Sequence, residues 1–303
     1  MSARDEPRAG REFGRVLGLV EAERLLLREF GRMAAAYDRY SVTSRPVVWR
    51  EIRKLLPNLR GRRALDLACG TGAHATRLAR ATGPAGSVVG IDAAEGMIRY
   101  ARHKSGAHRR KNLQFLVMDS RRLKFPARSF DFVLSTFGFA YYDRRRCLRE
   151  VLRILKEGGL FLHVGWHGAN PESKVFVDAL TELRGRNPPP ADVRRLALAR
   201  QRVSRLPENR SRKGKLTLAA ELRRRGFRHV HQVVRAVTAR FRDPAAYVRY
   251  KATWGEYERD LRRLSRRERQ DFVEDIARRM RWSPAHKGFM VTWNLAFTFG
   301  WKP

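Results

Sequence analysis

Two rhythms of hydrophobic positions run along the chain. Residues 16–30 and 46–56 repeat apolar side chains at helical spacing, and Pro46 stands at a first-turn position. From residue 62 short apolar runs alternate with helical stretches. The pattern predicts strands at 63–68, 87–92, 113–118, 130–136 and 160–165, with helices at 73–81, 94–103 and 144–155. Because these strands are apolar on both faces and are separated by helices, they predict a buried parallel sheet.

The alternation breaks after Trp166 and later resumes. Three consecutive prolines at 188–190 exclude a helix or a central strand there, so 170–215 is predicted to be an insertion with helical pieces. A helix at 216–225 and a strand at 230–241 follow. Residues 244–281 are predicted to be helical and very basic, and 289–299 form a last strand.

Composition narrows the class of protein. The chain has 303 residues, of which 43% are hydrophobic, so it can bury a sizeable core. No run of 18 apolar residues predicts a membrane span, and the N-terminus lacks the apolar segment of a signal peptide. Two cysteines, Cys69 and Cys147, cannot build a disulfide framework. We therefore expect a reduced, cytoplasmic protein.

Charge is the unusual quantity. Sixty-five basic residues against thirty acidic ones give a net charge of +35. The excess either serves an anionic partner, such as nucleic acid or a membrane surface, or reflects a bias toward Arg. Its even spread favours the bias, so nucleic acid and peripheral membrane contact stay open without being favoured. Under the bias, Arg259, Arg262, Arg263, Arg266, Arg267 and Arg269 should pair at helical spacing with Glu256, Glu258, Asp260 and Glu268.

Candidate chemistry begins where the first predicted strand ends. Gly70 and Gly72 form a glycine-rich turn that opens a helix, where the backbone can approach a ligand closely. Asp92 ends the second strand, where a carboxylate can accept both hydroxyls of a ribose. The spacing also matches the dinucleotide fingerprint of dehydrogenases. Asp66, inside the strand, would repel a pyrophosphate but attract an ammonium, and Asp119 could accept from an adenine amino group.

These motifs together resemble those of class I S-adenosylmethionine-dependent methyltransferases, especially the ubiquinone- and menaquinone-biosynthesis-like branch, also called methyltransferase type 11. The first motif is Leu65-Asp66-Leu67-Ala68-Cys69-Gly70-Thr71-Gly72. The segments at 90–97, 118–126, 129–133 and 148–159 resemble later motifs of that family, and 34–38 resembles its N-terminal segment.

The resemblance implies an α/β fold: a Rossmann-like, doubly wound, seven-stranded sheet with its last strand antiparallel, and with helical N-terminal and inserted lid segments. We accordingly divide the chain into six parts. They are an N-terminal helical cap at 1–60, a cofactor-binding core at 61–169, an insertion at 170–215, a core continuation at 216–242, a basic helical insertion at 243–285 and a terminal core strand at 286–303.

The resemblance also implies S-adenosylmethionine as the cofactor, with contacts divided among its parts. Eleven residues would together hold the methionine moiety, the ribose and the adenine. They are Tyr37, Asp66, Ala68, Gly70, Gly72, Asp92, Ala93, Met97, Asp119, Ser120 and Ser135. Tyr37 and Ser135 would close over the methionine end, and Asp92 would take the ribose.

Catalysis by methyl transfer depends chiefly on positioning, because the leaving group is neutral. A general base is needed only for a hydroxyl or a weakly acidic carbon, and His167, past the fifth strand, is the candidate. Phe137, Tyr141, Tyr142 and Trp166 are candidates for stacking on the acceptor. The scattered histidines and the two cysteines show no metal-ligand spacing.

The leading interpretation is methyl transfer to a small-molecule acceptor, such as a quinone-like, aromatic, polyketide or isoprenoid metabolite. An RNA methyltransferase that uses the Arg-rich surface is the alternative, and so is a catalytically inactive binding protein of the same fold. An NAD-dependent dehydrogenase is disfavoured by Asp66. The sequence does not determine the oligomeric state.

Overall fold

A single seven-stranded sheet organises the protein in the order β3-β2-β1-β4-β5-β7-β6. The computed structural model describes residues 18–44, 46–106, 110–138, 143–168, 171–204, 217–253, 255–282 and 288–303. The strands are β1 (Arg63–Leu67), β2 (Ser87–Asp92), β3 (Leu113–Val117), β4 (Phe130–Thr136), β5 (Leu155–Trp166), β6 (Arg228–Phe241) and β7 (Phe289–Trp301).

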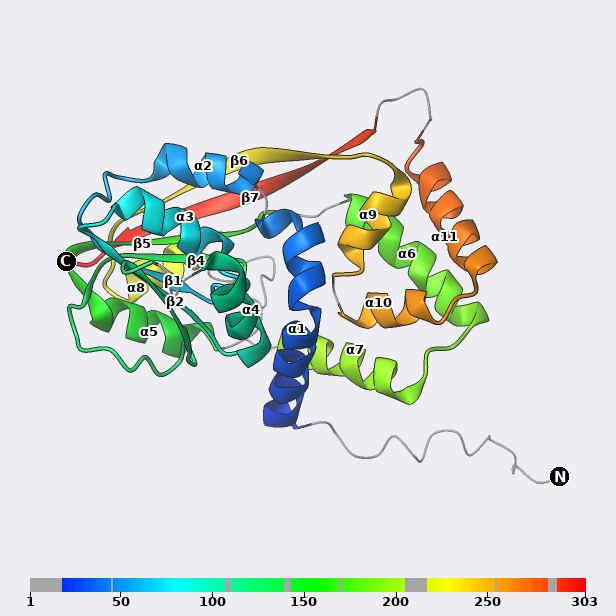
Figure 1. Ribbon diagram of the computed structural model, residues 1–303, viewed down its shortest axis with the longest axis horizontal. Coiled ribbons are helices and arrows are strands. Elements are labelled where there is room, and N and C mark those ends of the chain that lie inside the picture. The colour runs from blue at the N-terminus through cyan, green and yellow to red at the C-terminus, as the bar shows by residue number, and fades with distance from the viewer. Residues whose placement is uncertain are drawn as a thin grey trace.

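The pairing confirms the predicted fold class. β1 to β5 pair in parallel, whereas β7 runs antiparallel to both of its neighbours, β5 and β6. Together with the flanking helices this is a doubly wound α/β sheet whose last strand is antiparallel (Figure 1). The carboxyl ends of the central parallel strands therefore meet at one edge, which is where ligands bind in such sheets.

Alternation along the strands assigns helices to the two faces. On β4, Val133 joins a buried cluster with α5 (Arg144–Ile154) and α8 (Leu218–Arg224). Its neighbours Phe132 and Leu134 join the cluster on the opposite face. That face is covered by α2 (Pro46–Leu55), α3 (Ala73–Thr82) and α4 (Glu95–Ser105), and a short 3-10 turn, η2 (Val42–Ser44), precedes α2.

A second group of helices lies beyond the sheet (Figure 1). It comprises α6 (Pro171–Arg186), α7 (Ala191–Ser204), α9 (Pro244–Lys251), α10 (Gly255–Arg262) and α11 (Arg266–Arg279). β6 and β7 continue past the end of β5 as a two-stranded ribbon toward this group. Phe176, Tyr247 and Phe272 of these helices share one buried cluster with Trp293 of the ribbon, so the apolar core continues from the sheet into the group.

The strand β5 is longer than the sequence predicts. β5 begins at Leu155 and runs through Gly158 and Gly159, although strand was expected only at 160–165. Backbone hydrogen bonds with Lys302 explain this, since Gly158 N–H donates to its carbonyl and the Gly159 carbonyl accepts from its N–H. The antiparallel partner β7 therefore overrides the helix-stop signal of the two glycines.

The first helix also extends beyond its prediction. Helix was expected at 16–30, whereas α1 spans Leu19–Tyr40 as one element between the sheet and the second helical group (Figure 1). Its later turns are buried because Ala34 packs on Ala94 and Met97 at the start of α4. Its earlier turns pack Ala22 and Leu26 against Leu196, Ala199 and Val203 of α7.

Gly31 of α1 and Gly96 of α4 make the closest approach between these two helices. A Cβ built on Gly96 would lie 2.5 Å from the Gly31 Cα, and one built on Gly31 would lie 3.2 Å from the Gly96 backbone. The backbones can touch only because both residues lack a side chain. This crossing fixes the height of α1 above the sheet.

Some of the arginines form ion pairs that connect different helices. Arg259 of α10 pairs with Glu29 of α1 and Asp192 of α7, which lie on different elements. Pairs at the predicted helical spacing also occur, namely Arg262 with Glu258 and Arg263 with Asp260. Two predicted pairings are wrong. Glu256 pairs with Arg200 of α7, and the Glu268 carboxylate accepts from the backbone N–H of Ser265 in the capping box of α11.

The described ranges contain no helix that is long and apolar enough to cross a membrane.

Replacing Gly96 with Ala should force α1 away from α4. We expect the free energy of unfolding to fall by about 1–3 kcal/mol, the usual cost of overpacking. Gly185→Ala, in the helical backbone of α6 with nothing within 4 Å of the added Cβ, is the matched control. It should be neutral or stabilise by about 0.5–1 kcal/mol. Urea denaturation measures both, and equal effects of the two substitutions would contradict the close crossing.

Candidate functional site

The turn after β1 is built from left-handed backbone. Ala68, Gly70 and Gly72 have φ values of 58°, 53° and 74°. Glycine adopts this region at little cost, but Ala68 does so under strain of about 1–3 kcal/mol, a sign of a functional turn. The sequence of left-handed residues turns the chain sharply from the strand into α3, so its backbone faces the edge of the sheet.

Gly72 has a structural reason to be glycine. A Cβ at this position would lie 2.5 Å from the ring of Phe115 on β3. Gly72 therefore allows α3 to begin directly over the sheet.

Asp92 ties the turn to the second strand. Its Oδ2 accepts from the backbone N–H of Gly70 at 2.9 Å, and its Oδ1 accepts from that of Ala94 at 2.8 Å. Burial raises the pKa of this carboxyl, although the two backbone N–H groups oppose that shift. A carboxylate has room for further donors beyond these two, so Asp92 can still accept from ligand hydroxyls.

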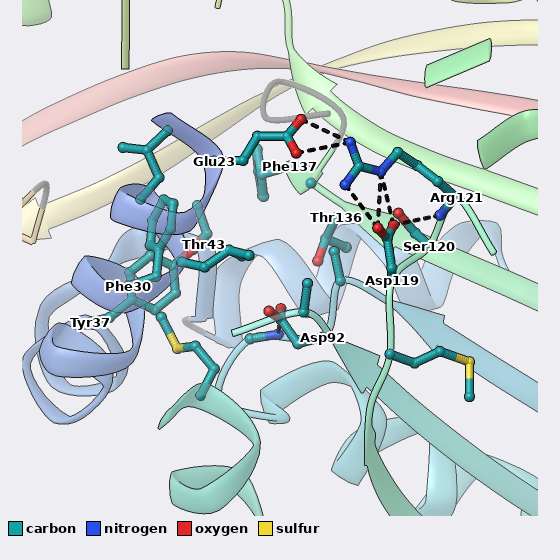
Figure 2. Close-up of a pocket in the computed structure, with 18 of the residues that line it drawn as sticks. Glu23, Phe30, Tyr37, Thr43, Asp92, Asp119, Ser120, Arg121, Thr136 and Phe137 are labelled. Carbon is teal, nitrogen blue, oxygen red and sulfur yellow. Dashed lines mark hydrogen bonds and ion pairs between the residues drawn. The ribbon is translucent and has the colours of Figure 1, made fainter. Parts of the chain in front are cut away.

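A cavity opens above this turn, at the carboxyl ends of the strands (Figure 2). Its wall includes ten of the residues predicted for cofactor or acceptor: Tyr37, Ala68, Gly70, Asp92, Ala93, Met97, Asp119, Ser120, Phe137 and Trp166. Tyr141 and Tyr142 lie outside the described residues. The sequence motifs thus converge on one hollow.

Four predicted residues are not part of this wall: Asp66, Gly72, Ser135 and His167. Asp66 and Ser135 are fully buried behind it, and burial raises the pKa of the Asp66 carboxyl to about 7. His167 is exposed, and its backbone N–H donates to the carbonyl of Asn294. Their assigned roles stay predictions.

The wall also contains residues that the sequence did not suggest: Glu23, Leu26, Leu27, Phe30, Thr43, Met118, Arg121, Thr136 and Gly138. Four of them come from α1, which forms a roof over the cavity (Figure 2). The helical periodicity of 16–30 indicated that this helix has an apolar face. Nothing local indicated that the face covers the glycine-rich turn.

Arg121 joins the roof to the sheet. Its Nη1 lies 2.8 and 2.9 Å from the two carboxylate oxygens of Glu23, and its Nη2 lies 2.8 Å from Oδ2 of Asp119 (Figure 2). Burial opposes ionisation of Asp119, but the hydrogen bonds and charge of Arg121 outweigh it and lower the pKa of that carboxyl. The guanidinium thus stands between two ionised carboxylates.

The described wall carries an excess of negative charge in a strongly basic protein. It holds three carboxylates, those of Glu23, Asp92 and Asp119, against the single guanidinium of Arg121. None of the arginines between 259 and 269 belongs to it. The described part of the chain also brings no three potential metal ligands together. The cavity therefore suits a ligand with positive charge.

Aromatic rings form the part of the wall that follows β4 and β5. Phe137, directly after β4, has a strained φ of 60°, and its ring centroid lies 4.7 Å from that of Trp166 at the end of β5. Trp293 on β7 lies behind Trp166, at 6.2 Å between centroids. Trp166 is 39% exposed, so this aromatic pair stands where the cavity meets solvent.

Hydroxyl groups line the side of the cavity next to the glycine-rich turn. Tyr37 Oη and Thr43 Oγ1 lie 2.7 Å apart, and Ser41 Oγ lies 2.8 Å from the same Thr43 atom. The Thr43 carbonyl contacts Nε2 of buried His74 at 2.9 Å. The end of α1 is thereby fastened to α3, and Tyr37 is held against the cavity.

Comparison with known proteins agrees with this geometry. A family model described as "Methyltransferase domain" matches residues 64–159. Demethylmenaquinone methyltransferase of Geobacillus kaustophilus is 38% identical over 138 residues, which are 44% of this chain and 59% of that protein. The Lactococcus lactis enzyme of the same name is 33% identical over 135 residues, 43% of this chain and 54% of that protein. The chain thus spans less than 60% of the length of these curated relatives.

Solved structures show the same fold over a larger part of the chain. A protein described as a putative type II methyltransferase from Anaeromyxobacter dehalogenans has a TM-score of 0.52 at 21% identity, covering 84% of this chain and 94% of that one. Haemonchus contortus phosphoethanolamine N-methyltransferase 2 has a TM-score of 0.53 at 18% identity, covering 95% and 61%. Residues 64–159 thus match a methyltransferase domain, and the sheet that contains them has the fold of these solved structures.

Proposed function

We propose that the protein transfers the methyl group of S-adenosylmethionine to an uncharged, largely apolar small molecule held between α1 and the ends of β4 and β5. The single observation that carries the proposal is the make-up of the cavity wall. Its carboxylates outnumber its one guanidinium, and it also contains the aromatic pair of Phe137 and Trp166. A cationic cofactor matches the carboxylates, and an apolar acceptor matches the rings.

The carboxylates of the wall support binding of the cofactor. Asp92 would accept from the ribose hydroxyls while it holds Gly70 and Ala94 in place. Met97 and Ala93 would flank the adenosine, and Ser120 would face the adenine together with Asp119. S-adenosylmethionine supplies a methyl group on a sulfonium, with a neutral leaving group. The acidic wall would therefore favour it over its uncharged thioether product.

The aromatic pair supports binding of the acceptor. Phe137 and Trp166 offer a tilted pair of ring faces, with Leu27 and Phe30 of α1 in the same wall. Flat conjugated rings stack on such faces and expel water from them. The curated relatives are named demethylmenaquinone methyltransferases, so a short-chain demethylated naphthoquinone in its reduced, electron-rich hydroquinone form is the first acceptor to try.

Positioning would supply most of the rate. Among the described residues the wall contains no His, Lys or Cys that could take a proton from the acceptor. An uncharged acceptor that is deprotonated without help from these side chain types therefore matches this site best. The role predicted for His167 would require its side chain to reach the wall from its exposed place after β5.

Titration calorimetry with S-adenosylmethionine and with NAD, followed by transfer of labelled methyl groups, tests the proposal. We expect binding of S-adenosylmethionine but not of NAD, and methyl transfer to the reduced naphthohydroquinone rather than to bulk tRNA. Salt-sensitive binding and methylation of tRNA would favour the RNA alternative. Cofactor binding without transfer to any acceptor would favour the inactive binding protein.

Asp92→Ala should weaken S-adenosylmethionine binding by about 1.5–3 kcal/mol, the range for hydrogen bonds to a charged group. Asp131→Ala is the matched control, because that carboxylate also accepts from a backbone N–H, of Arg63, but lies outside the cavity wall. The control should cost stability and leave cofactor affinity unchanged. Calorimetry on both folded variants measures this, and equal affinities would refute the ribose assignment.

Cofactor affinity should fall as the pH drops below about 7. Burial raises the pKa of Asp66 to about 7 without a ligand, and a bound ammonium would stabilise the ionised form. Binding then releases a proton, so affinity rises with pH through that value, by up to about tenfold per unit below it. Asp66→Asn should remove this dependence, while Asp92 still titrates in both proteins. If cofactor affinity depends on pH in the same way in the wild type and in Asp66→Asn, Asp66 has a structural role and does not bind the ammonium.

Trp166→Ala should raise KM for the acceptor roughly tenfold or more, because the aromatic wall loses most of its stacking area. The dissociation constant of the cofactor should stay the same. Trp301→Ala, near the opposite end of the β5–β7 pair, serves as the control and should leave KM unchanged. Steady-state kinetics measure both variants. An unchanged KM for the acceptor in Trp166→Ala would show that the acceptor does not bind against Trp166.

A further inference from the structure

The earlier turns of α1 cover the cavity in which the cofactor would lie. Leu26, Leu27 and Phe30 all belong to the wall, and Phe30 lies across the cavity from Asp119 and Ser120 (Figure 2). They shield this part of the cavity from solvent, whereas the part at Trp166 is open. Movement of the roof would widen the path by which cofactor enters and product leaves.

The two ends of α1 are held very differently. After Gly31 the helix is fixed to the domain below it by the backbone crossing with Gly96, and by Asp38, which accepts from Thr71 and pairs with Lys104. Burial of Tyr37 and its hydrogen bond to Thr43 add to this. The later part of α1 is therefore an anchored segment.

Before Gly31 the helix has a single ion pair with the sheet domain among the described residues, that of Glu23 with Arg121. Its other charged contacts point to the second helical group, as Glu21 pairs with Arg195 of α7 and Glu29 with Arg259 of α10. Glu23 lies eight residues before Gly31, about 12 Å along the helix axis. The ion pair thus holds α1 far from the point where the helix crosses α4 at Gly31 and Gly96.

We propose that Glu23 and Arg121 form the catch of a lid, in which the part of α1 before Gly31 swings about the Gly31–Gly96 crossing to exchange cofactor and product. The proposal rests on the proposed function, because it takes S-adenosylmethionine and its demethylated product as the occupants. Arg121 and Glu23 are positioning residues in it, since they hold the wall in place.

The geometry of Arg121 suits a catch that opens at one side only. Its Nε and Nη2 hold Asp119, while its Nη1 holds Glu23. When Glu23 leaves, the guanidinium stays on Asp119, so no carboxylate is left uncompensated beside the adenine. Glu23 itself moves into water, where a carboxylate is well solvated. Toward the sheet domain, opening therefore breaks one partly exposed ion pair, a modest interaction that salt screens, and the apolar contacts of Leu27 and Phe30 in the cluster with Met97. The packing of Ala22 and Leu26 on α7 is kept when α7 moves with the helix.

Glu23→Gln tests the catch, because it removes the charge and keeps the shape. We expect the dissociation rate of S-adenosylhomocysteine, followed by stopped-flow displacement, to rise roughly three- to tenfold. The wild-type rate should increase with salt, whereas the variant's rate should be nearly independent of it. Glu21→Gln is the matched control on the same helix, since it breaks only the pair with Arg195, and it should behave as the wild type.

A double-substitution cycle adds a readout that a merely structural role would not move. Arg121→Gln should also speed dissociation, and adding Glu23→Gln to it should give no further increase, because the two side chains act as one pair. Equal dissociation rates and equal salt slopes in the wild type and Glu23→Gln would overturn the catch while leaving the proposed function intact. Failure of the wild type to bind S-adenosylmethionine in calorimetry would overturn both.

Discussion

The carboxylate of Asp92 is the constraint on which the arrangement of the site depends. It accepts from Gly70 in the turn after β1 and from Ala94 before α4, so one side chain fixes the exits of two adjacent strands. The start of α4 in turn places Gly96, and Gly96 sets where α1 can cross. The floor and the roof of the cavity are thus linked through a single half-buried acid, whose pKa is raised because the carboxyl loses water of solvation.

The chain is strongly basic and its cavity is acidic, and ion pairing between arginines and carboxylates makes the two compatible. Arginines at the helix contacts are engaged with carboxylates, as Arg32 and Arg259 are with the buried Glu29. Such pairs align helices α1, α7 and α10, and they use up local charge rather than presenting it to a ligand. Within the described wall, the one guanidinium is held by two carboxylates. A chain of net charge +35 therefore still offers a pocket suited to a cation.

Two strained backbone positions line the cavity. Of the non-glycine residues with positive φ in the described chain, Ala68 and Phe137 both line the cavity. Each directly follows the last residue of a parallel strand, and each turns the chain so that backbone or ring faces inward. The surrounding sheet can hold these conformations because β1 and β4 are buried central strands with partners on both sides.

The sequence by itself determined the sheet, its glycine-rich turn and the wall that these elements supply, because strand periodicity and turn chemistry act between near neighbours in the chain. Ala68, Gly70, Asp92 and Asp119 could be assigned from their places at strand ends alone. Tertiary structure alone decided the roof. Glu23 and Arg121 are 98 residues apart, and Arg121 is one of many arginines, so no local pattern distinguishes it. Their contact exists only because two helices cross at glycines, and such a crossing depends on packing that sequence periodicity does not encode.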